Sequence, residues 1–279
     1  MSEEKNRFPK GQWRLIIHGP GRGSGNMAVD EAIARMAGEG HVPPTLRLYA
    51  WDPPCISLGR HQSIADIDVD KAQAHGIDVV RRPTGGRAIL HVDEITYSVA
   101  GPADEPRLRG MVLDCYLRLS EGITRGLERL GVRVYKADAS ARAGPDVSAA
   151  CFEVPSAYEI LTVDGRKIVG SAQVRKKDWV LQHGAIPLYG DVARLVDYLA
   201  LEEDVRHALR GALAQRATSV EHALGHPVSF AEAAQALTQG FSEALNVEFT
   251  EGTLTPEEYA LAEILEREVY TQSHWTYRI

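Results

Sequence analysis

The sequence predicts an α+β fold with mixed and antiparallel sheets flanked by helices. Two observations predict this class. Short segments rich in β-branched and aromatic residues alternate with apolar stripes at helical spacing over about the first 190 residues, and helix-start signals dominate the remainder. No repeat, linker or low-complexity tract interrupts the 279 residues. We therefore expect a single domain over residues 1–279, with a core at about 12–190 and a helical C-terminal extension at about 191–279.

The first part of the chain is predicted to alternate between strands and helices. A strand at 13–17 runs into a glycine-rich turn at 19–25. A helix should follow, because Val29 and Ile33 lie on one apolar stripe, and Gly38 should end it. Further elements are predicted as strands at 45–51, 55–59 and 78–82 and as a short helix at 69–75.

Two hairpins are predicted next. One joins residues 88–91 to 95–99, and the other joins 158–163 to 167–175 through an Asp-Gly turn. The other elements predicted for this part are a helix at 111–130, a strand at 132–135, a long irregular stretch at 137–155 and a strand at 179–188.

The last 90 residues or so show a helical pattern. Two capping boxes mark the starts of helices, one formed by Ser229 with Glu232 and the other by Thr255 with Glu258. The second also has proline at the first helical position. This part of the chain is therefore expected to be mainly helical.

Composition and charge restrict the possible partners. The chain has 31 Lys and Arg against 38 Asp and Glu, which is too acidic for a general nucleic-acid binder. Residues 81–180 nevertheless carry 16 basic and 13 acidic residues, so this region either receives an acidic partner or forms an ordinary mixed surface. The amino terminus lacks an apolar signal region, and no stretch approaches 18 uninterrupted apolar residues. We expect no nucleic-acid partner, no membrane partner and a cytoplasmic location.

One loop has the composition of a ligand-binding loop. Arg82, Thr84, Gly85 and Gly86 lie in the sequence Arg-Pro-Thr-Gly-Gly-Arg, between two predicted strands. The glycines allow backbone to approach a ligand closely, and the guanidinium groups supply fixed positive charge. A hairpin loop with solvated arginines is the competing interpretation.

A second candidate region lies in the predicted strands that follow. Gly170, Ser171 and Ala172 interrupt apolar strand material just after Lys167, and small residues within a strand often mark close approach of a ligand. His183 lies in the next strand within Gln-His-Gly. Taken alone, such a lysine more often faces solvent, and such a histidine is more often structural.

The three cysteines differ in their surroundings. Their odd number and wide spacing give no disulfide framework and no zinc pattern, so reduced thiols are expected. Cys55 and Cys115 lie in apolar patterns typical of core thiols. Cys151 lies in the irregular stretch, where a nearby cation such as Lys167 would favour the nucleophilic thiolate.

Six ordered segments together closely resemble the lipoate-protein ligase and octanoyltransferase family. They are Asn-Met-Ala-Val-Asp-Glu at 26–31, Ser-Leu-Gly-Arg-His-Gln at 57–62, Arg-Pro-Thr-Gly-Gly-Arg-Ala-Ile-Leu-His at 82–91, Asp-Glu-Ile-Thr-Tyr-Ser at 93–98, Gly-Arg-Lys-Ile-Val-Gly-Ser-Ala-Gln at 165–173 and Gln-His-Gly-Ala-Ile at 182–186. The resemblance covers roughly residues 12–190 and implies the catalytic fold of biotinyl and lipoyl protein ligases. The pattern from Cys151 to Glu159, Cys-Phe-x-x-Pro-Ser-x-Tyr-Glu, is similar to the octanoyltransferase group of this family, whose members use this cysteine as nucleophile.

The resemblance implies a reaction. Cys151 would take an octanoyl group from the phosphopantetheine thioester of acyl carrier protein and pass it to a lysine of a lipoyl domain, with the glycine cleavage H protein as the expected acceptor. Lys167 would stabilise the thiolate. The implied substrate-binding residues are Arg82, Thr84, Gly85, Gly86, His91, Gly170, Ser171, Ala172 and His183. No metal or other cofactor is implied, because a thioester is already activated.

Three alternatives stay open at this point. An ATP-dependent lipoate ligase would use Lys167 to contact an acyl-adenylate, and Cys151 would be incidental. An octanoyl amidotransferase would move the acyl group between lipoyl domains. A non-catalytic lipoyl-binding or regulatory protein would keep only the scaffold.

Overall fold

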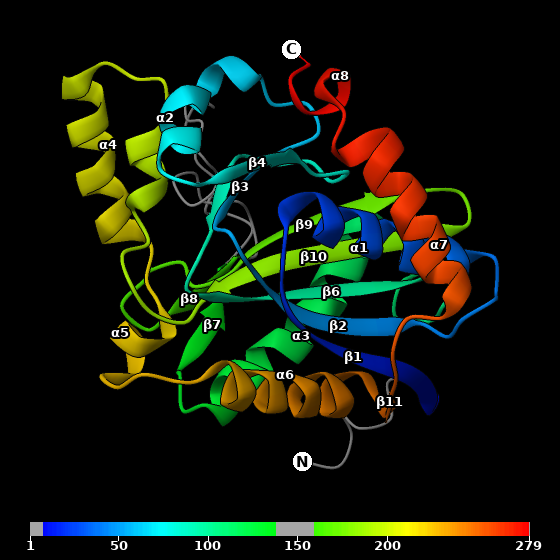
Figure 1. Cartoon of the computed structure of the whole chain (residues 1–279). Helices are drawn as coiled ribbons and strands as arrows, with labels where there is room; N and C mark the ends of the chain where they lie inside the picture. The colour runs from blue at the N-terminus through cyan, green and yellow to red at the C-terminus, as the bar shows by residue number, and fades with distance from the viewer. Residues whose placement is uncertain (1–7, 138–158, 279) are drawn as a thin grey trace.

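The computed structural model describes residues 8–137 and 159–278, and its centre is a six-stranded mixed sheet (Figure 1). In spatial order its strands are β11 (Val247–Glu251), β1 (Gly11–Gly21), β2 (Thr45–Trp51), β6 (Glu94–Pro102), β10 (Trp179–Pro187) and β9 (Gly170–Arg175). β1 is parallel to both β11 and β2, whereas the pairs β2–β6, β6–β10 and β10–β9 are antiparallel. The fold is α+β with mixed and antiparallel sheets, which confirms the predicted class.

Two smaller sheets complete the strands of the described residues. One has the order β4 (Asp78–Arg81), β3 (Cys55–Leu58) and β5 (Ile89–His91), and the other pairs β7 (Val134–Lys136) with β8 (Ile160–Thr162). The α-helices are α1 (Gly23–Gly38), α2 (Val69–Ala74), α3 (Val112–Arg129), α4 (Glu203–Arg216), α5 (Val220–Leu224), α6 (Phe230–Leu245), α7 (Pro256–Leu265) and α8 (Ser273–Thr276). Short 3₁₀ turns, η2 (Ile64–Asp66) and η3 (Arg194–Tyr198), and a π turn, η4 (Glu266–Tyr270), join them.

Helices cover both faces of the central sheet (Figure 1). The predicted stripe of α3, including Cys115 and Leu119, is buried with α6 against one face. Glycines allow the close approach of these two helices, since a Cβ on Gly240 would lie 2.3 Å from the backbone nitrogen of Gly126. On the other face α1 packs against the sheet and against α7. Both capping boxes, at Ser229 and Thr255, are formed as predicted.

Several local predictions are wrong. Residues 88–91 and 95–99 do not form a hairpin, because β5 pairs with β3 in the small sheet whereas β6 joins the central sheet. The second predicted hairpin survives only as a single bridge between Leu161 and Lys167, since β8 pairs with β7 and β9 with β10. The sequence pattern within each segment was strand-like, but it carries no information on which strand is the partner.

The predicted glycine-rich turn is also shorter than expected. Gly21 ends β1 and Gly23 begins α1, so most of residues 19–25 lies in regular structure. The C-terminal part is mainly helical, as expected, and it also supplies β11, a strand that its pattern did not indicate. β11 runs parallel to β1 at the edge of the central sheet. Among the residues that the structure describes, no helix is both long and apolar enough to cross a membrane.

Arg81 ties the last residues of the chain to the small sheet. Its side chain is fully buried, and it donates hydrogen bonds to the carbonyls of Gly59 and Gln62 at 2.8 and 2.6 Å. It also donates to the carbonyls of Thr276 and Arg278 at 3.0 and 2.8 Å. A buried guanidinium requires such acceptors, so the C-terminal residues are part of the structure around the adjoining loop.

Candidate active site

A cavity lies between the small sheet and the central sheet, with a volume of about 390 Å³ counted out to its opening. We call it the central cavity, and its lining residues are Met27, Tyr49, Trp51, Ser57, Arg82, Gly86, Ile89, His91, Thr96, Gly170, Ser171, Ala172, His183, Gly184 and Ala185. Seven of the nine binding residues predicted from the sequence are among them. The other two, Thr84 and Gly85, contact lining residues. The fold therefore brings together segments that lie far apart in the chain.

Arg82 organises the loop that borders this cavity. Its guanidinium donates to the carbonyls of Ser57, Gly85 and Arg87 at 2.8, 2.7 and 2.8 Å. Only 3% of the residue is exposed. The sequence interpretation assigned this charge to a ligand, whereas the structure also uses it to hold the loop against the end of β3. A buried cation therefore holds the backbone carbonyls of the loop in place.

The loop also lies directly on a neighbouring turn. A Cβ on Gly59 would lie 1.8 Å from the carbonyl oxygen of Gly86, so no side chain fits there. The next residue, Arg60, donates its backbone N–H to the carbonyl of Thr84 at 2.8 Å. Gly86 has a φ of +90°, a conformation that glycine adopts without strain. These contacts explain why both segments carry glycine.

His183 is fixed by a partner on each ring nitrogen. Nδ1 lies 3.3 Å from a carboxylate oxygen of Asp30, and Nε2 lies 2.7 Å from the hydroxyl of Thr84. Burial lowers the pKa of His183, and the hydrogen bond and charge of Asp30 oppose this only in part. The ring is therefore neutral near pH 7. Because a carboxylate only accepts, Nδ1 carries the hydrogen and the Thr84 hydroxyl donates to Nε2.

Asp30 lies beneath the cavity as a fully buried carboxylate. It accepts hydrogen bonds from Arg47, Tyr49 and Ser98, each at 2.8 Å, in addition to His183. Burial alone would raise the pKa of Asp30, but the guanidinium of Arg47 and the bond from His183 lower it below its usual value. The carboxylate is thus ionised, and from α1 it orients groups of β2, β6 and β10.

A second buried network holds His91. Its Nε2 lies 2.7 Å from the hydroxyl of Ser57, and its Nδ1 lies 2.7 Å from a carboxylate oxygen of Glu94. The ring stacks on Trp51 with centroids 4.0 Å apart. Trp51 donates to Thr96 at 2.7 Å, and Thr96 donates to the same carboxylate. The aromatic end of the cavity is therefore positioned by consecutive hydrogen bonds.

Ser171 lies on the wall that separates this cavity from an outer groove. Its hydroxyl is 2.8 Å from the phenol of Tyr97, which also accepts a hydrogen bond from Gln182 at 3.0 Å. Burial raises the pKa of Tyr97 to about 12, so the phenol is neutral. The outer groove is lined by Met111, Val112, Leu113, Tyr116, Glu159, Lys167, Val169, Ser171, Ala172 and Gln173.

Lys167 lies in this outer groove and is almost fully buried. Its ammonium donates to a carboxylate oxygen of Glu159 at 2.6 Å, and the two residues are 6% and 4% exposed. The groove shares Ser171 and Ala172 with the central cavity, so Lys167 lies beside the wall of that cavity. Cys151, the predicted nucleophile, lies outside the residues that the structure describes.

The sequence interpretation missed several residues that shape the site. They are Met27, Asp30, Arg47, Tyr49, Trp51, Ser57, Ile89, Glu94, Thr96, Ser98 and Glu159. For Asp30 a signal was present, because it lies three residues before Ile33 on the apolar stripe of α1, where a carboxylate must have buried partners. Within the described residues no group of three or more His, Cys, Asp or Glu side chains could hold a metal ion.

The arrangement suits an apolar acyl ligand, with aromatic and aliphatic side chains around the cavity, the neutral ring of His183 in its wall and the buried ammonium of Lys167 beside that wall. The chain belongs to the lipoyl protein ligase A/B catalytic domain family, whose model matches residues 23–242. Within this family it is similar to octanoyltransferase LipM from Kyrpidia tusciae, at 43% identity over 272 residues covering 95% of this chain and 98% of the relative. Octanoyltransferase LipM from Moorella thermoacetica is 42% identical over 276 residues, covering 97% and 100%. By this homology the chain is an acyltransferase of the LipM type in protein lipoylation.

Solved structures agree with the fold. A bi-partite lipoate protein ligase from Thermoplasma acidophilum has a TM-score of 0.79 and 27% identity, with 97% of each chain covered. A lipoate-protein ligase A bound with ATP has a TM-score of 0.76 and 27% identity, covering 96% of this chain and 99% of that one. The predicted ligase-like catalytic fold is confirmed.

Proposed function

We propose that the protein transfers an octanoyl group from octanoyl-acyl carrier protein to a lysine of a lipoyl domain through a thioester on Cys151. The observation that carries the proposal is the central cavity, where seven of the predicted binding residues form one enclosed space beside the buried Lys167. The relatives named octanoyltransferase LipM support the same acyl group. The acceptor we propose is the glycine cleavage H protein.

The cavity suits an unbranched acyl chain. Its walls combine aromatic and aliphatic side chains with the small residues Gly170 and Ala172. An octanoyl group has seven carbons beyond its carbonyl, and burying them at about 0.8 kcal/mol each contributes roughly 5–6 kcal/mol to binding. Asp30 and His183 near the cavity already have protein partners, so neither group needs a hydrogen bond from the acyl chain.

The chemistry takes place in two balanced steps. The Cys151 thiolate attacks the thioester carbonyl of the donor, a new carbon–sulfur bond forms, the carbon–sulfur bond to phosphopantetheine breaks, and the phosphopantetheine leaves as a thiolate that takes a proton from solvent. The neutral ε-amine of the acceptor lysine then attacks the octanoyl-cysteine, an amide forms, the bond to Cys151 breaks so that Cys151 leaves as thiolate, and the proton lost by the amine passes to solvent. In this proposal the ammonium of Lys167 stabilises the thiolate, and no metal or nucleotide takes part.

One assay separates this proposal from its alternatives. Purified protein is mixed with octanoyl-acyl carrier protein and apo-H protein without ATP, and transfer is followed by intact-mass spectrometry. We expect octanoylated H protein and a single octanoyl adduct on Cys151. The matched control is Cys115→Ala, which removes a buried core thiol and should leave the adduct in place.

The other outcomes are equally specific. Modification that occurs only with lipoate and ATP would establish the ligase. Modification only from octanoylated H protein to another lipoyl domain would establish the amidotransferase. No modification under any of these conditions would establish a non-catalytic protein, and full activity of Cys151→Ser would remove the thioester mechanism.

A further inference from the structure

The floor of the central cavity crosses four neighbouring strands of the central sheet. Gly170 of β9 pairs with Ala185 of β10. Ala185 pairs with Thr96 of β6, which pairs in turn with Tyr49 of β2. All four residues line the cavity. The cavity therefore runs across the strands, along one row of the sheet from β9 to β2.

The β9 end of this row lies beside Lys167. The outer groove that contains Lys167 shares Ser171 and Ala172 with the central cavity, and both of these residues belong to β9. Ala217 forms a bridge with Lys167 and belongs to one hydrophobic cluster with Ile89, which also lines the central cavity. In the proposed mechanism the acyl carbonyl reacts beside Lys167, so the distal carbons would extend from β9 toward β2.

The spacing of the strands gives this row a length scale. Strands β9 and β6 are separated by two strand spacings of about 4.8 Å each, or about 10 Å. An extended octanoyl chain measures roughly 9 Å from its carbonyl carbon to its terminal methyl, because C–C bonds of about 1.5 Å follow a zigzag path. The terminal methyl would therefore lie over Thr96, and the side chains at the β2 end of the cavity would form the wall that it meets.

Met27 of α1 belongs to this end wall. It lines the cavity, it is 1% exposed, and it lies in one hydrophobic cluster with Tyr49 and Trp51 of β2. The two aromatic side chains donate hydrogen bonds, Tyr49 to Asp30 and Trp51 to Thr96, so truncating either would leave a buried polar group without its partner. Met27 has an unbranched apolar side chain, so shortening it deepens the cavity and removes no polar group.

We propose that Met27 sets the length of the acyl chain by closing the β2 end of the central cavity. This inference rests on the proposed function, since it takes the ligand to be a fatty acyl chain whose carbonyl lies beside Lys167. In the Met27→Ala protein the lost side chain leaves space in the cluster for the last carbons of a longer chain. One or two methylenes are enough to discriminate tenfold or more in a closed apolar pocket.

The test measures binding and transfer separately. Dissociation constants of octanoate and decanoate are measured by calorimetry for the wild type and for Met27→Ala, and transfer is measured from octanoyl- and decanoyl-acyl carrier protein. We expect the preference for decanoate over octanoate to rise at least about tenfold in Met27→Ala, in binding and in transfer alike.

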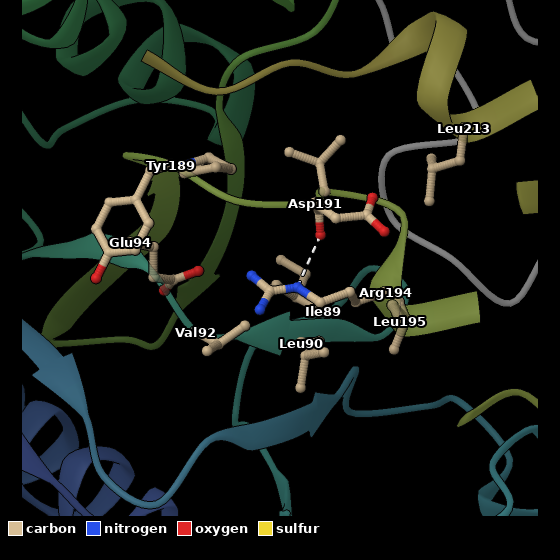
Figure 2. Close-up of a pocket in the computed structure, with 11 residues that line it drawn as sticks. Ile89, Leu90, Val92, Glu94, Tyr189, Asp191, Arg194, Leu195 and Leu213 are labelled. Carbon is tan, nitrogen blue, oxygen red and sulfur yellow. Dashed lines mark hydrogen bonds between the residues drawn. The ribbon is translucent and has the colours of Figure 1, made fainter. Parts of the chain in front are cut away.

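The matched control shortens an aliphatic side chain at the other end of the same cavity. Ile89 lies near Lys167 and also borders a neighbouring cavity together with Leu195 and Leu213 (Figure 2). Ile89→Ala therefore opens the central cavity where the carbonyl end of the chain would lie. It should weaken both acids by a similar factor and leave their ratio close to that of the wild type.

Each outcome decides the question. An unchanged length preference in a folded Met27→Ala protein overturns the inference, as does an equal rise in Ile89→Ala. If Met27→Ala does not fold, Met27→Val must show a smaller rise of the same sign, and no rise there refutes the inference. A wild type that binds octanoate but transfers nothing from the carrier protein contradicts the proposed function alone, because the binding ratios still decide the role of Met27.

Discussion

Replacing Asp30 by asparagine should destabilise the protein strongly, because this carboxylate is the common acceptor of four buried donors. Arg47, Tyr49 and Ser98 donate to it at 2.8 Å, and His183 lies at 3.3 Å. The residue is fully buried, and Arg47 is 2% exposed. The NH₂ group of an asparagine would face a side chain that is itself a hydrogen-bond donor. The substitution would also leave the guanidinium of Arg47 buried without its counter-ion.

The magnitude follows from the geometry of this pair. Breaking a buried ion pair by removing one partner costs about 3–5 kcal/mol. At about 2–4 °C per kcal/mol for a chain of more than 150 residues, the melting temperature should fall by roughly 10 °C. The exposed pair formed by Glu243 with Arg129 on the surface of α6 offers a contrast, and Glu243→Gln should cost less than about 1 kcal/mol.

Urea unfolding, followed by circular dichroism, gives the free energies. The set consists of Asp30→Asn, Arg47→Met, the double variant and Glu243→Gln. The double variant should be less destabilised than the sum of the single variants, because it leaves neither charge unpaired. A loss below 1 kcal/mol in Asp30→Asn, or strict additivity in the double variant, would refute the reasoning.

Three further predictions follow from other contacts. Lys167→Met should lower the initial rate of octanoyl transfer at least about 100-fold, since it removes the cation proposed to stabilise the thiolate, and a rate within tenfold of wild type would contradict this role. Burial and the charge of a neighbouring arginine lower the pKa of His18 from 6.5 to about 4, so the folded protein binds this proton less readily than the unfolded chain. Stability should therefore fall as the pH drops from 6.5 toward 4, and urea unfolding of His18→Gln should show a shallower slope in that window. Gly59→Ala should displace the loop at Gly86, which should lower the free energy of unfolding by about 1–3 kcal/mol and weaken octanoate binding in a calorimetric titration. A Cβ on Gly85 would meet nothing within 4 Å, so Gly85→Ala should behave like wild type in the same titration.

The sequence predicted the elements of this fold better than their partners. The helix stripe of α3 and both capping boxes depend on residues three or four apart, and they appear where expected. The pairing of β5 with β3 depends on residues more than thirty positions apart, so the local pattern of residues 88–99 could not reveal it. β11 was missed for the same reason, since among the described strands it pairs with β1, which lies at the other end of the chain.

The candidate site shows a similar division. Glycines and arginines mark Arg82 and Gly86 in the sequence, because few other residue types permit such a loop. The structure adds that the guanidinium of Arg82 binds backbone carbonyls, which no pattern indicates. Tyr49 and Ile89 look like ordinary strand residues, and their place in the cavity depends on two sheets packing face to face.

The clamp formed by Arg81 has a consequence for biosynthesis. Three of its acceptors are the carbonyls of Trp275, Thr276 and Arg278, the last of them 197 positions further along the chain. A ribosome that has made the small sheet has not yet made these groups, so the guanidinium cannot be buried with all its hydrogen bonds during most of translation. The loop that follows Arg81 and borders the cavity should therefore become ordered only after residues 275–278 have emerged from the ribosome. Until then the nascent protein would bind no acyl group.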